Sequence, residues 1–306
     1  MNTVETYLKL AERPNTRRSY AAAVKHFEQE WRGLLPATPD SIARYLADQA
    51  TAVAINTLRL RLAGLSRWHT DHGFADPTKA KLVTQVLKGI RAAHSAPERQ
   101  AKPLELMQLQ QVVDWLELST PSASEDARIH RLRRTRDRAM LLMGFWRGFR
   151  ADELTSLKIE NITVEQGVGM SIFLPRSKGD RESEGRHYQC PALSRLCPVA
   201  AYEAWIATAG ITEGPVFRKI DRWGNLRGEA MAAGSVIPWL RHLFQAAGVA
   251  EPERYSSHSL RRGFAGWART SGWDLKALME YVGWKDVNAA MRYLDTAADD
   301  LQAKFE

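Results

Sequence analysis

Cysteines and long apolar runs are both scarce in this chain of 306 residues. Its two cysteines, Cys190 and Cys197, are seven residues apart, a spacing that matches no zinc ligand set. We expect buried thiols in a reducing compartment. No run of about 18 apolar residues occurs, which predicts that no segment spans a membrane. The first residues lack a basic start followed by an apolar stretch, so we expect no secretion signal and a cytoplasmic protein.

Signatures of bound cofactors are missing as well. No Gly-x-x-x-x-Gly-Lys-Ser/Thr loop occurs in the sequence, and no cluster of carboxylates suited to two metal ions stands out. The sequence therefore carries no signature of a nucleotide or metal cofactor.

Positive charge is in excess, and it is unevenly distributed. The net charge is +8; residues 1–100 carry 15 lysines and arginines against 9 acidic residues, and the remaining residues carry 28 against 26. A basic first part suggests a surface that binds a polyanion such as a nucleic acid. On charge alone, a solvated and soluble surface explains the excess equally well.

The length predicts two domains, each large enough to bury a core. Residues 94–103 are polar, contain two prolines and show no periodicity, so we interpret them as a linker. Before the linker, apolar residues recur at helical spacing, for example in the helix expected over 55–72. Residues 1–93 are therefore predicted to form a small domain of four to five helices.

Residues 104–306 are predicted to form a second domain of helices around a small antiparallel sheet. Strands are expected at 159–164, 168–174 and 187–191, and residues 218–228 are interpreted as a basic loop. The predicted fold class is mainly α with a small antiparallel β-sheet in the second domain. Two such domains joined by an extended linker form a clamp that can close around a duplex.

The stretch from Ser257 to Asp295 carries the strongest chemical signal. His258 and Arg261 are three residues apart, so on a helix they share a face, and Trp284 precedes Tyr293 by nine residues. A phenol beside an arginine and an imidazole can act as a covalent nucleophile, because positive charge favours its oxyanion. The positive charge of the arginine and the imidazole can also bind a phosphate. A lone tyrosine on an amphipathic helix is far more often a packing or surface residue, so this signal needs support from elsewhere in the chain.

That support comes from two further motifs in a fixed order. Upstream of the stretch stand Gly148-Phe-Arg150-Ala-Asp-Glu153-Leu154 and Arg176-Ser-Lys178-Gly179-Asp180. Together with His258-x-x-Arg261, Gly283-Trp284 and Tyr293, they resemble the boxes of the tyrosine recombinase (phage integrase) family over about half of the chain. Trp284 stands where many members carry histidine, so the chain looks most like the Cre-like branch.

The resemblance implies an enzyme that breaks and rejoins DNA without metal or ATP, through a 3′-phosphotyrosine intermediate. It implies that Tyr293 is the nucleophile and that a mobile loop delivers Lys178 to protonate the departing 5′ oxygen. The remaining implied roles are phosphate binding by Arg150 and Arg261, hydrogen-bond donation by His258 and Trp284, and orientation of the arginines by Glu153.

Partners are implied in the same way. The family acts on double-stranded DNA with inverted-repeat recombination sites as a homotetramer, and its members dock a carboxy-terminal tail into a neighbouring protomer. The tail of this chain, Thr296–Glu306, is expected to dock in the same way, and packing on its own domain is the alternative. The first domain resembles the family's core-binding domain, which grips the duplex. The basic residues in and near the helix at 55–72 that we expect to contact DNA are Arg59, Arg61, Arg67, Lys79, Lys81 and Lys88. A bacterial, phage or mobile-element origin and association with the nucleoid follow as expectations.

Two other functions remain open at this point. A type IB topoisomerase-like enzyme uses a similar pocket and would relax supercoils without a specific site. A catalytically silent DNA-binding regulator on the same scaffold would bind DNA without cleaving it. The short chain with its amphipathic tail favours recombination over relaxation, and the complete set of motif residues argues against a silent regulator.

Overall fold

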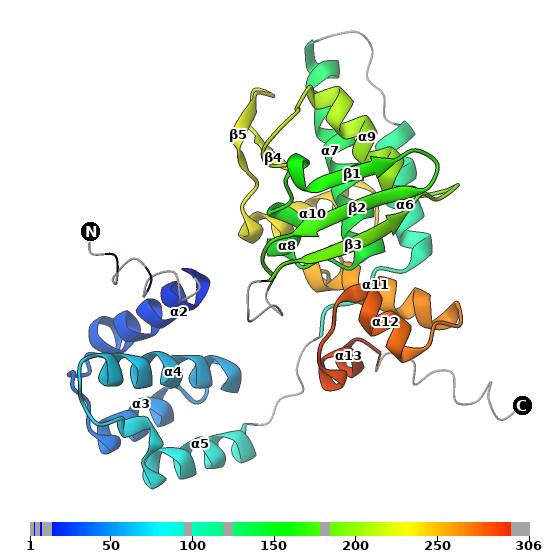
Figure 1. Ribbon diagram of the computed structural model, residues 1–306. Coiled ribbons are helices and arrows are strands. Elements are labelled where there is room, and N and C mark those ends of the chain that lie inside the picture. The colour runs from blue at the N-terminus through cyan, green and yellow to red at the C-terminus, as the bar shows by residue number, and fades with distance from the viewer. Residues whose placement is uncertain are drawn as a thin grey trace, which may run out of the picture. The chain divides into compact units, whose positions relative to one another are not determined.

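The computed structural model describes Thr3, Tyr7 and residues 14–94, 100–118, 125–177 and 184–294. The chain divides into two compact units, unit 1 (residues 1–99) and unit 2 (residues 100–306) (Figure 1). The described chain is mostly helical, and unit 2 adds small antiparallel sheets, which confirms the predicted fold class. In the described ranges no helix is both long enough and apolar enough to cross a membrane.

Unit 1 is a helical bundle. Its helices are α2 (Pro14–Lys25), which continues into a π-helical turn (His26–Glu30), α3 (Pro39–Gln49), α4 (Ile55–Asp71) and α5 (Lys81–Ala93). Gly64 allows α4 to approach α2 closely, since a Cβ at this position would lie 2.8 Å from the Cβ of Ala23. The fully buried side chains of this core are those of Phe27, Ile42, Tyr45, Leu46, Leu58, Leu65 and Val83.

One buried histidine joins the segment before α3 to α4. His69 is fully buried on α4; its Nδ1 lies 2.7 Å from the carbonyl oxygen of Leu65 and its Nε2 lies 2.8 Å from the backbone nitrogen of Ala37. A neutral imidazole that donates to Leu65 and accepts from Ala37 satisfies both contacts. His69 therefore has a structural role in unit 1.

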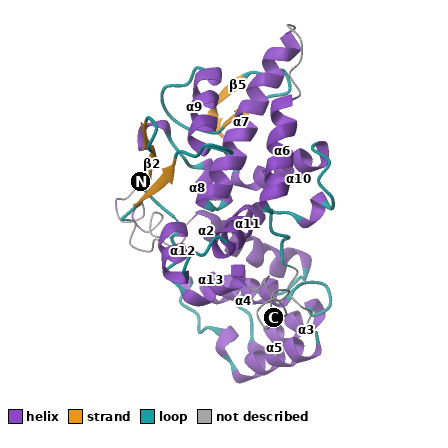
Figure 2. Ribbon diagram, turned by 90° about the vertical axis from the view of Figure 1, so that its right-hand side faces the viewer, coloured by secondary structure: helices purple, strands orange, loops and turns teal. Residues whose placement is uncertain are grey.

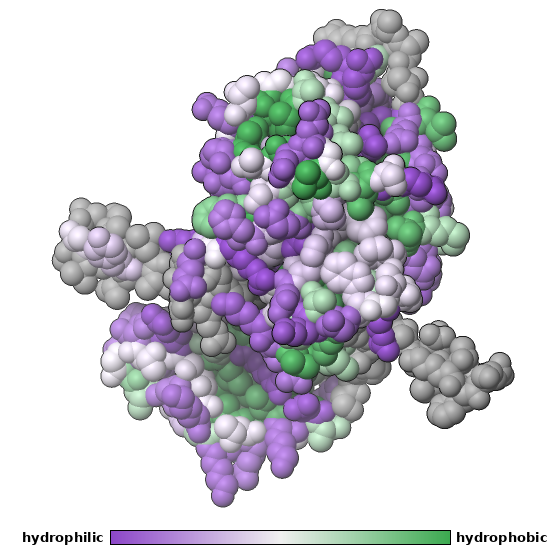
Figure 3. Space-filling view, turned by 45° about the vertical axis from the view of Figure 1, so that its right-hand side comes forward, coloured by the Kyte–Doolittle hydropathy of each residue, from purple (hydrophilic) through white to green (hydrophobic). Residues whose placement is uncertain are grey.

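Unit 2 packs helices behind a three-stranded antiparallel sheet, whose outer strands alternate between more buried and more exposed residues (Figure 1). The sheet has the order β1 (Ile162–Glu165), β2 (Gly169–Leu174) and β3 (Arg186–Pro191), with Ile172 opposite Tyr188. The helices are α6 (Leu106–Leu118), α7 (Glu125–Arg147), α8 (Ala151–Thr155), α9 (Pro198–Ala209), α10 (Val236–Ala246), α11 (Ser257–Thr270), α12 (Leu275–Val282) and α13 (Val287–Leu294). Hydrophilic side chains cover much of the face of unit 2 shown in Figure 3, as expected for a unit with a buried core.

Helix α7 is the central element of the core of unit 2. Its last turns, residues 139–145, are almost completely buried and pack against α9 and α11 (Figure 2). Gly144 brings α7 close to α11, because a Cβ there would lie 2.8 Å from Cδ1 of Leu260. This packing fixes the end of α7, at Arg147, against the helix that carries His258 and Arg261.

Two local predictions from the sequence are wrong. The predicted basic loop at 218–228 is a hairpin of β4 (Arg218–Ile220) and β5 (Leu226–Ala230), whose turn is closed by Asp221 accepting hydrogen bonds from the backbone of Trp223 and Asn225, both at 2.9 Å. This aspartate turn contains no Asn-Gly or Asp-Gly pair, so the usual hairpin signal was missing. The strand expected from Ile159 begins only at Ile162, because residues 159–161 form a 3₁₀ turn.

Candidate active site

The turn between α7 and α8 presents Arg150. Gly148 ends α7 with a left-handed backbone (φ 57°), and Arg150 precedes the first residue of α8. Glu153, which is buried, accepts hydrogen bonds from the backbone nitrogen of Arg150 at 2.8 Å and from its Nη1 at 2.6 Å. The carboxylate therefore fixes both the backbone and the guanidinium of Arg150.

Arg261 lies beneath this turn and is 1% exposed. Its Nη1 donates to the carbonyl oxygen of Gly148 at 2.9 Å and lies 3.7 Å from Oε2 of Glu153, and its Nη2 donates to the carbonyl oxygen of Val282 at 3.3 Å. The pKa of Arg261 is lowered to about 10, mainly by burial and also by the nearby Arg150, whereas Glu153 raises it. Arg261 is thus protonated at neutral pH, and Glu153 lies close to both arginines.

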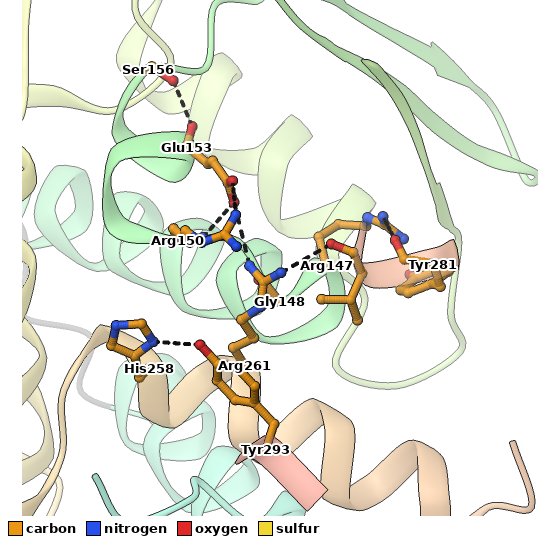
Figure 4. A network of polar contacts seen from close by, with 10 residues as sticks. Arg147, Gly148, Arg150, Glu153, Ser156, His258, Arg261, Tyr281 and Tyr293 are labelled. Atoms are coloured by element: carbon orange, nitrogen blue, oxygen red, sulfur yellow. Dashed lines mark hydrogen bonds and ion pairs between the residues drawn. The ribbon is translucent and has the colours of Figure 1, made fainter. Parts of the chain in front are cut away.

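Tyr293, on α13, meets His258 at the start of α11. The Tyr293 hydroxyl lies 2.9 Å from Nδ1 of His258 (Figure 4). The tyrosine ring stacks on Trp284 with ring centroids 5.1 Å apart, and its centroid lies 5.8 Å from Cζ of Arg261. Two segments that are 35 residues apart in the sequence therefore bring the phenol, the imidazole and a guanidinium together.

Trp284 is positioned by the end of α12. Gly283 ends that helix with a left-handed backbone (φ 80°), and a Cβ there would lie 3.1 Å from Nη1 of Arg186 and 3.2 Å from the hydroxyl of Tyr188. The turn therefore needs glycine for its conformation and for its space. Nε1 of Trp284 is buried and has no hydrogen-bond partner in the part of the chain that the structure describes, so it is available to donate to a ligand.

The structure brings together six of the seven residues predicted from the motifs: Arg150, Glu153, His258, Arg261, Trp284 and Tyr293. The seventh, Lys178, lies outside the described residues, as does the tail Thr296–Glu306. Among the described residues, no group of three or more His, Cys, Asp or Glu could hold a metal ion. Geometry alone does not assign roles, which remain predictions.

The six basic residues predicted to contact DNA lie in unit 1 and fall into two groups. Three have polar partners nearby. Nη1 of Arg61 donates a hydrogen bond to Oε1 of Gln49 at 3.0 Å. Nε of Arg67 lies 2.7 Å from Oδ2 of Asp71, and Nζ of Lys79 lies 3.6 Å from Oδ2 of Asp76. The other three, Arg59, Lys81 and Lys88, are exposed. Contact with DNA stays a prediction for all six.

Sequence reasoning missed Arg147, the last residue of α7. Its side chain is 2% exposed and contacts both β3 and α12. Its neighbours in space are far from it along the chain, and no local pattern marks it.

The comparisons with known proteins give one answer. Residues 123–299 match the model of the phage integrase family. An integrase/recombinase xerD homolog from Selenomonas ruminantium is 29% identical over 94% of this chain and 83% of its own length, and the recombinase cre of Escherichia phage P1 is 27% identical over 90% and 80%.

Solved structures share the fold. The XerH site-specific recombinase bound to palindromic difH substrate superposes with a TM-score of 0.66 at 19% identity, covering 94% of this chain and 78% of that one. Lambda integrase (residues 75–356) bound to DNA superposes with a TM-score of 0.59 at 17% identity, covering 97% of this chain and 96% of that one. The chain belongs to the phage integrase family, whose members are tyrosine recombinases, as the motifs predicted.

Proposed function

We propose that this protein is a site-specific tyrosine recombinase that cuts and rejoins double-stranded DNA through a 3′-phosphotyrosine intermediate. The observation that carries the proposal is the hydrogen bond of 2.9 Å between the Tyr293 hydroxyl and Nδ1 of His258, beside Arg261 and Trp284. Family membership supports the same conclusion. The reaction proceeds without ATP or a metal ion, because the phosphotyrosine ester conserves the energy of the broken phosphodiester bond.

In the cleavage step, the Tyr293 oxygen attacks phosphorus. A free phenol has a pKa of about 10, so loss of its proton to a neighbouring base assists the attack at neutral pH. His258 is within reach of that proton. The bond between the tyrosine oxygen and phosphorus forms as the bond between phosphorus and the 5′ oxygen breaks.

Charge neutralisation falls to the two arginines. Arg150 and Arg261 offer forked donors for the two non-bridging oxygens of the phosphate, and Nε1 of Trp284 adds a third donor. Arg261 is 1% exposed and has the Tyr293 ring beside it, so the ring must move before a phosphate reaches this guanidinium. Glu153 orients both arginines for the same phosphate.

The leaving 5′ oxygen needs a proton, and Lys178 is the residue that the family resemblance assigns to this step. Rejoining is the reverse reaction, in which a 5′ hydroxyl attacks the phosphotyrosine and Tyr293 leaves.

The partner is double-stranded DNA with inverted-repeat sites. The solved structures with this fold include recombinases bound to DNA, which supports this partner. Unit 1 grips the duplex as the core-binding domain through basic residues such as Arg59, Lys81 and Lys88. Four protomers assemble on two duplexes, and the tail Thr296–Glu306 of each docks into a neighbour. We place the protein in the cytoplasm, associated with the nucleoid, with an origin in a bacterium, a phage or another mobile element.

Replacing Tyr293 by phenylalanine tests the proposal. A nicked suicide substrate that carries the recombination site traps the covalent intermediate, which is detected as a band shift under denaturing conditions. We expect the wild type to form this adduct, and Tyr293→Phe to bind the same DNA with unchanged affinity but to form none. Wild-type protein that binds the site without forming an adduct supports the silent regulator, and relaxation of supercoils that lack any site supports the topoisomerase.

A further inference from the structure

The carboxy-terminal end of α12 is held by arginines from three different elements. Its last three carbonyl oxygens each accept a hydrogen bond from a guanidinium: Glu280 from Arg186 at 2.5 Å, Tyr281 from Arg147, and Val282 from Arg261 at 3.3 Å. The last carbonyls of a helix lack partners within the helix and carry partial negative charge, so cations stabilise them. This end of α12 leads directly through Gly283 to Trp284.

Arg147 is the arginine whose burial needs an explanation. It is 2% exposed, and its second fork nitrogen, Nη1, donates to the carbonyl oxygen of Gln189 on β3 at 3.1 Å. Its Cζ lies 3.6 Å from the centroid of the Tyr281 ring and 5.0 Å from that of Tyr188. Within the described ranges no ion pair with a carboxylate compensates its charge.

A buried cation without a counter-charge is a poor source of stability, because an apolar side chain of similar size often does as well or better. The geometry of the Arg147 guanidinium offers another reason why an arginine is present at this position. One planar group spans β3 and α12 and is anchored three residues before Arg150, on the opposite side of Gly148 (Figure 4).

We propose that Arg147 is a positioning residue. It fixes the end of α12, and therefore Trp284 and the Tyr293 ring stacked on it, relative to the turn that carries Arg150. This inference rests on the proposed function, because the geometry that it protects is that of the phosphate site. Arg147 does not touch the reacting groups.

The test is a double-mutant cycle on the single-turnover rate of covalent adduct formation at saturating DNA. Arg147→Met keeps an unbranched side chain of similar girth and removes the fork, and we expect a rate about 100-fold below wild type with unchanged DNA affinity, since small displacements of positioned groups cost this much. If Arg147 acts through Trp284, the double variant Arg147→Met/Trp284→Ala is no slower than the slower single variant. Rate losses that multiply overturn the inference.

Arg134→Met is the matched control. Arg134 also lies on α7 and places its Cζ 4.9 Å from the ring centroid of Trp115, but it is about 20 Å further along the helix. We expect this variant to cleave within twofold of wild type.

If Arg147→Met does not fold, Arg147→Lys replaces it in the cycle, because lysine keeps the charge but not the planar fork. A purely structural role predicts that cleavage falls only as far as the folded fraction does, and that result rejects the inference. Wild-type protein that forms no adduct rejects the proposed function itself, whereas an active wild type with an equally active Arg147→Met rejects the positioning role alone.

Discussion

Replacing Glu153 by glutamine measures how much one buried carboxylate stabilises the folded protein by neutralising two neighbouring arginines. The Glu153 side chain is 4% exposed and lies 2.6 Å from Nη1 of Arg150 and 3.7 Å from Nη1 of Arg261. Glutamine keeps the shape and one acceptor for the backbone of Arg150 but removes the negative charge. The two guanidiniums then face each other with no counter-charge from this position.

The stability that Glu153→Gln loses depends on how deeply the ion pair is buried. Removing one partner from a fully buried charge pair costs about 3–5 kcal/mol. Arg150 is 23% exposed, so water screens part of the loss, and we expect about 2–3 kcal/mol. For a unit of this size each kcal/mol lowers the melting temperature by about 2–4 °C, which gives a fall of roughly 5–10 °C. The pKa of Arg261 falls as well, because Glu153 is the largest of the groups that raise it.

Thermal unfolding followed by circular dichroism measures this effect with and without sulfate. If the site binds a phosphate as proposed, a sulfate ion should bind there too, so we expect sulfate to restore more of the melting temperature of Glu153→Gln than it adds to wild type. Glu203→Gln, an exposed carboxylate on α9, is the control and changes stability by less than about 0.5 kcal/mol. If both variants melt at the wild-type temperature, Glu153 does not stabilise the two arginines.

Two further predictions concern α11 and the buried thiol. Gly263→Ala places a Cβ 1.9 Å from the carbonyl oxygen of Leu104 and should destabilise unit 2 by about 2 kcal/mol or more. Gly266→Ala, on the same helix, meets no atom within 4 Å and should stabilise unit 2 by about 0.5–1 kcal/mol. Equal denaturation midpoints for the two variants would contradict this prediction. Burial raises the pKa of Cys190 to about 12, so we expect mass spectrometry to find it unalkylated by iodoacetamide at pH 8 until the chain unfolds. Because the thiol ionises at lower pH in the unfolded chain, the stability due to Cys190 is lost as the pH rises from about 9 towards 12, and rapid labelling of the native protein would refute its burial.

Local features of the structure were predictable where the cause is local. Asp274 caps α12 by accepting from the backbone of Ala277 at 2.8 Å, and Gly148 ends α7, which are positions that aspartate and glycine favour in helices generally. The motif residues of the site could also be identified, because the family's boxes are short and keep their order.

The contacts that assemble the site are not local, and the sequence alone did not indicate them. Arg147 finds its partners 42 and 134 residues away, at Gln189 and Tyr281. Nothing in the neighbourhood of Arg147 distinguishes it from the other arginines of α7, which lie at the surface or in partly buried positions. Its role depends on which carbonyls the fold leaves without partners, and only the packed structure reveals those.

The proposed binding of a phosphate also accounts for the unfavourable environment of Arg261. Arg261 is buried, close to a second guanidinium, and its pKa is lowered as a result. Under the proposed function, a phosphate bound here supplies a counter-charge in a region of low dielectric constant and favours the charged form of Arg261. We therefore expect the binding of a phosphate to raise the pKa of Arg261. The Tyr293 ring lies beside the same guanidinium and Glu153 neutralises part of its charge, so these two side chains also stabilise Arg261 in its buried position.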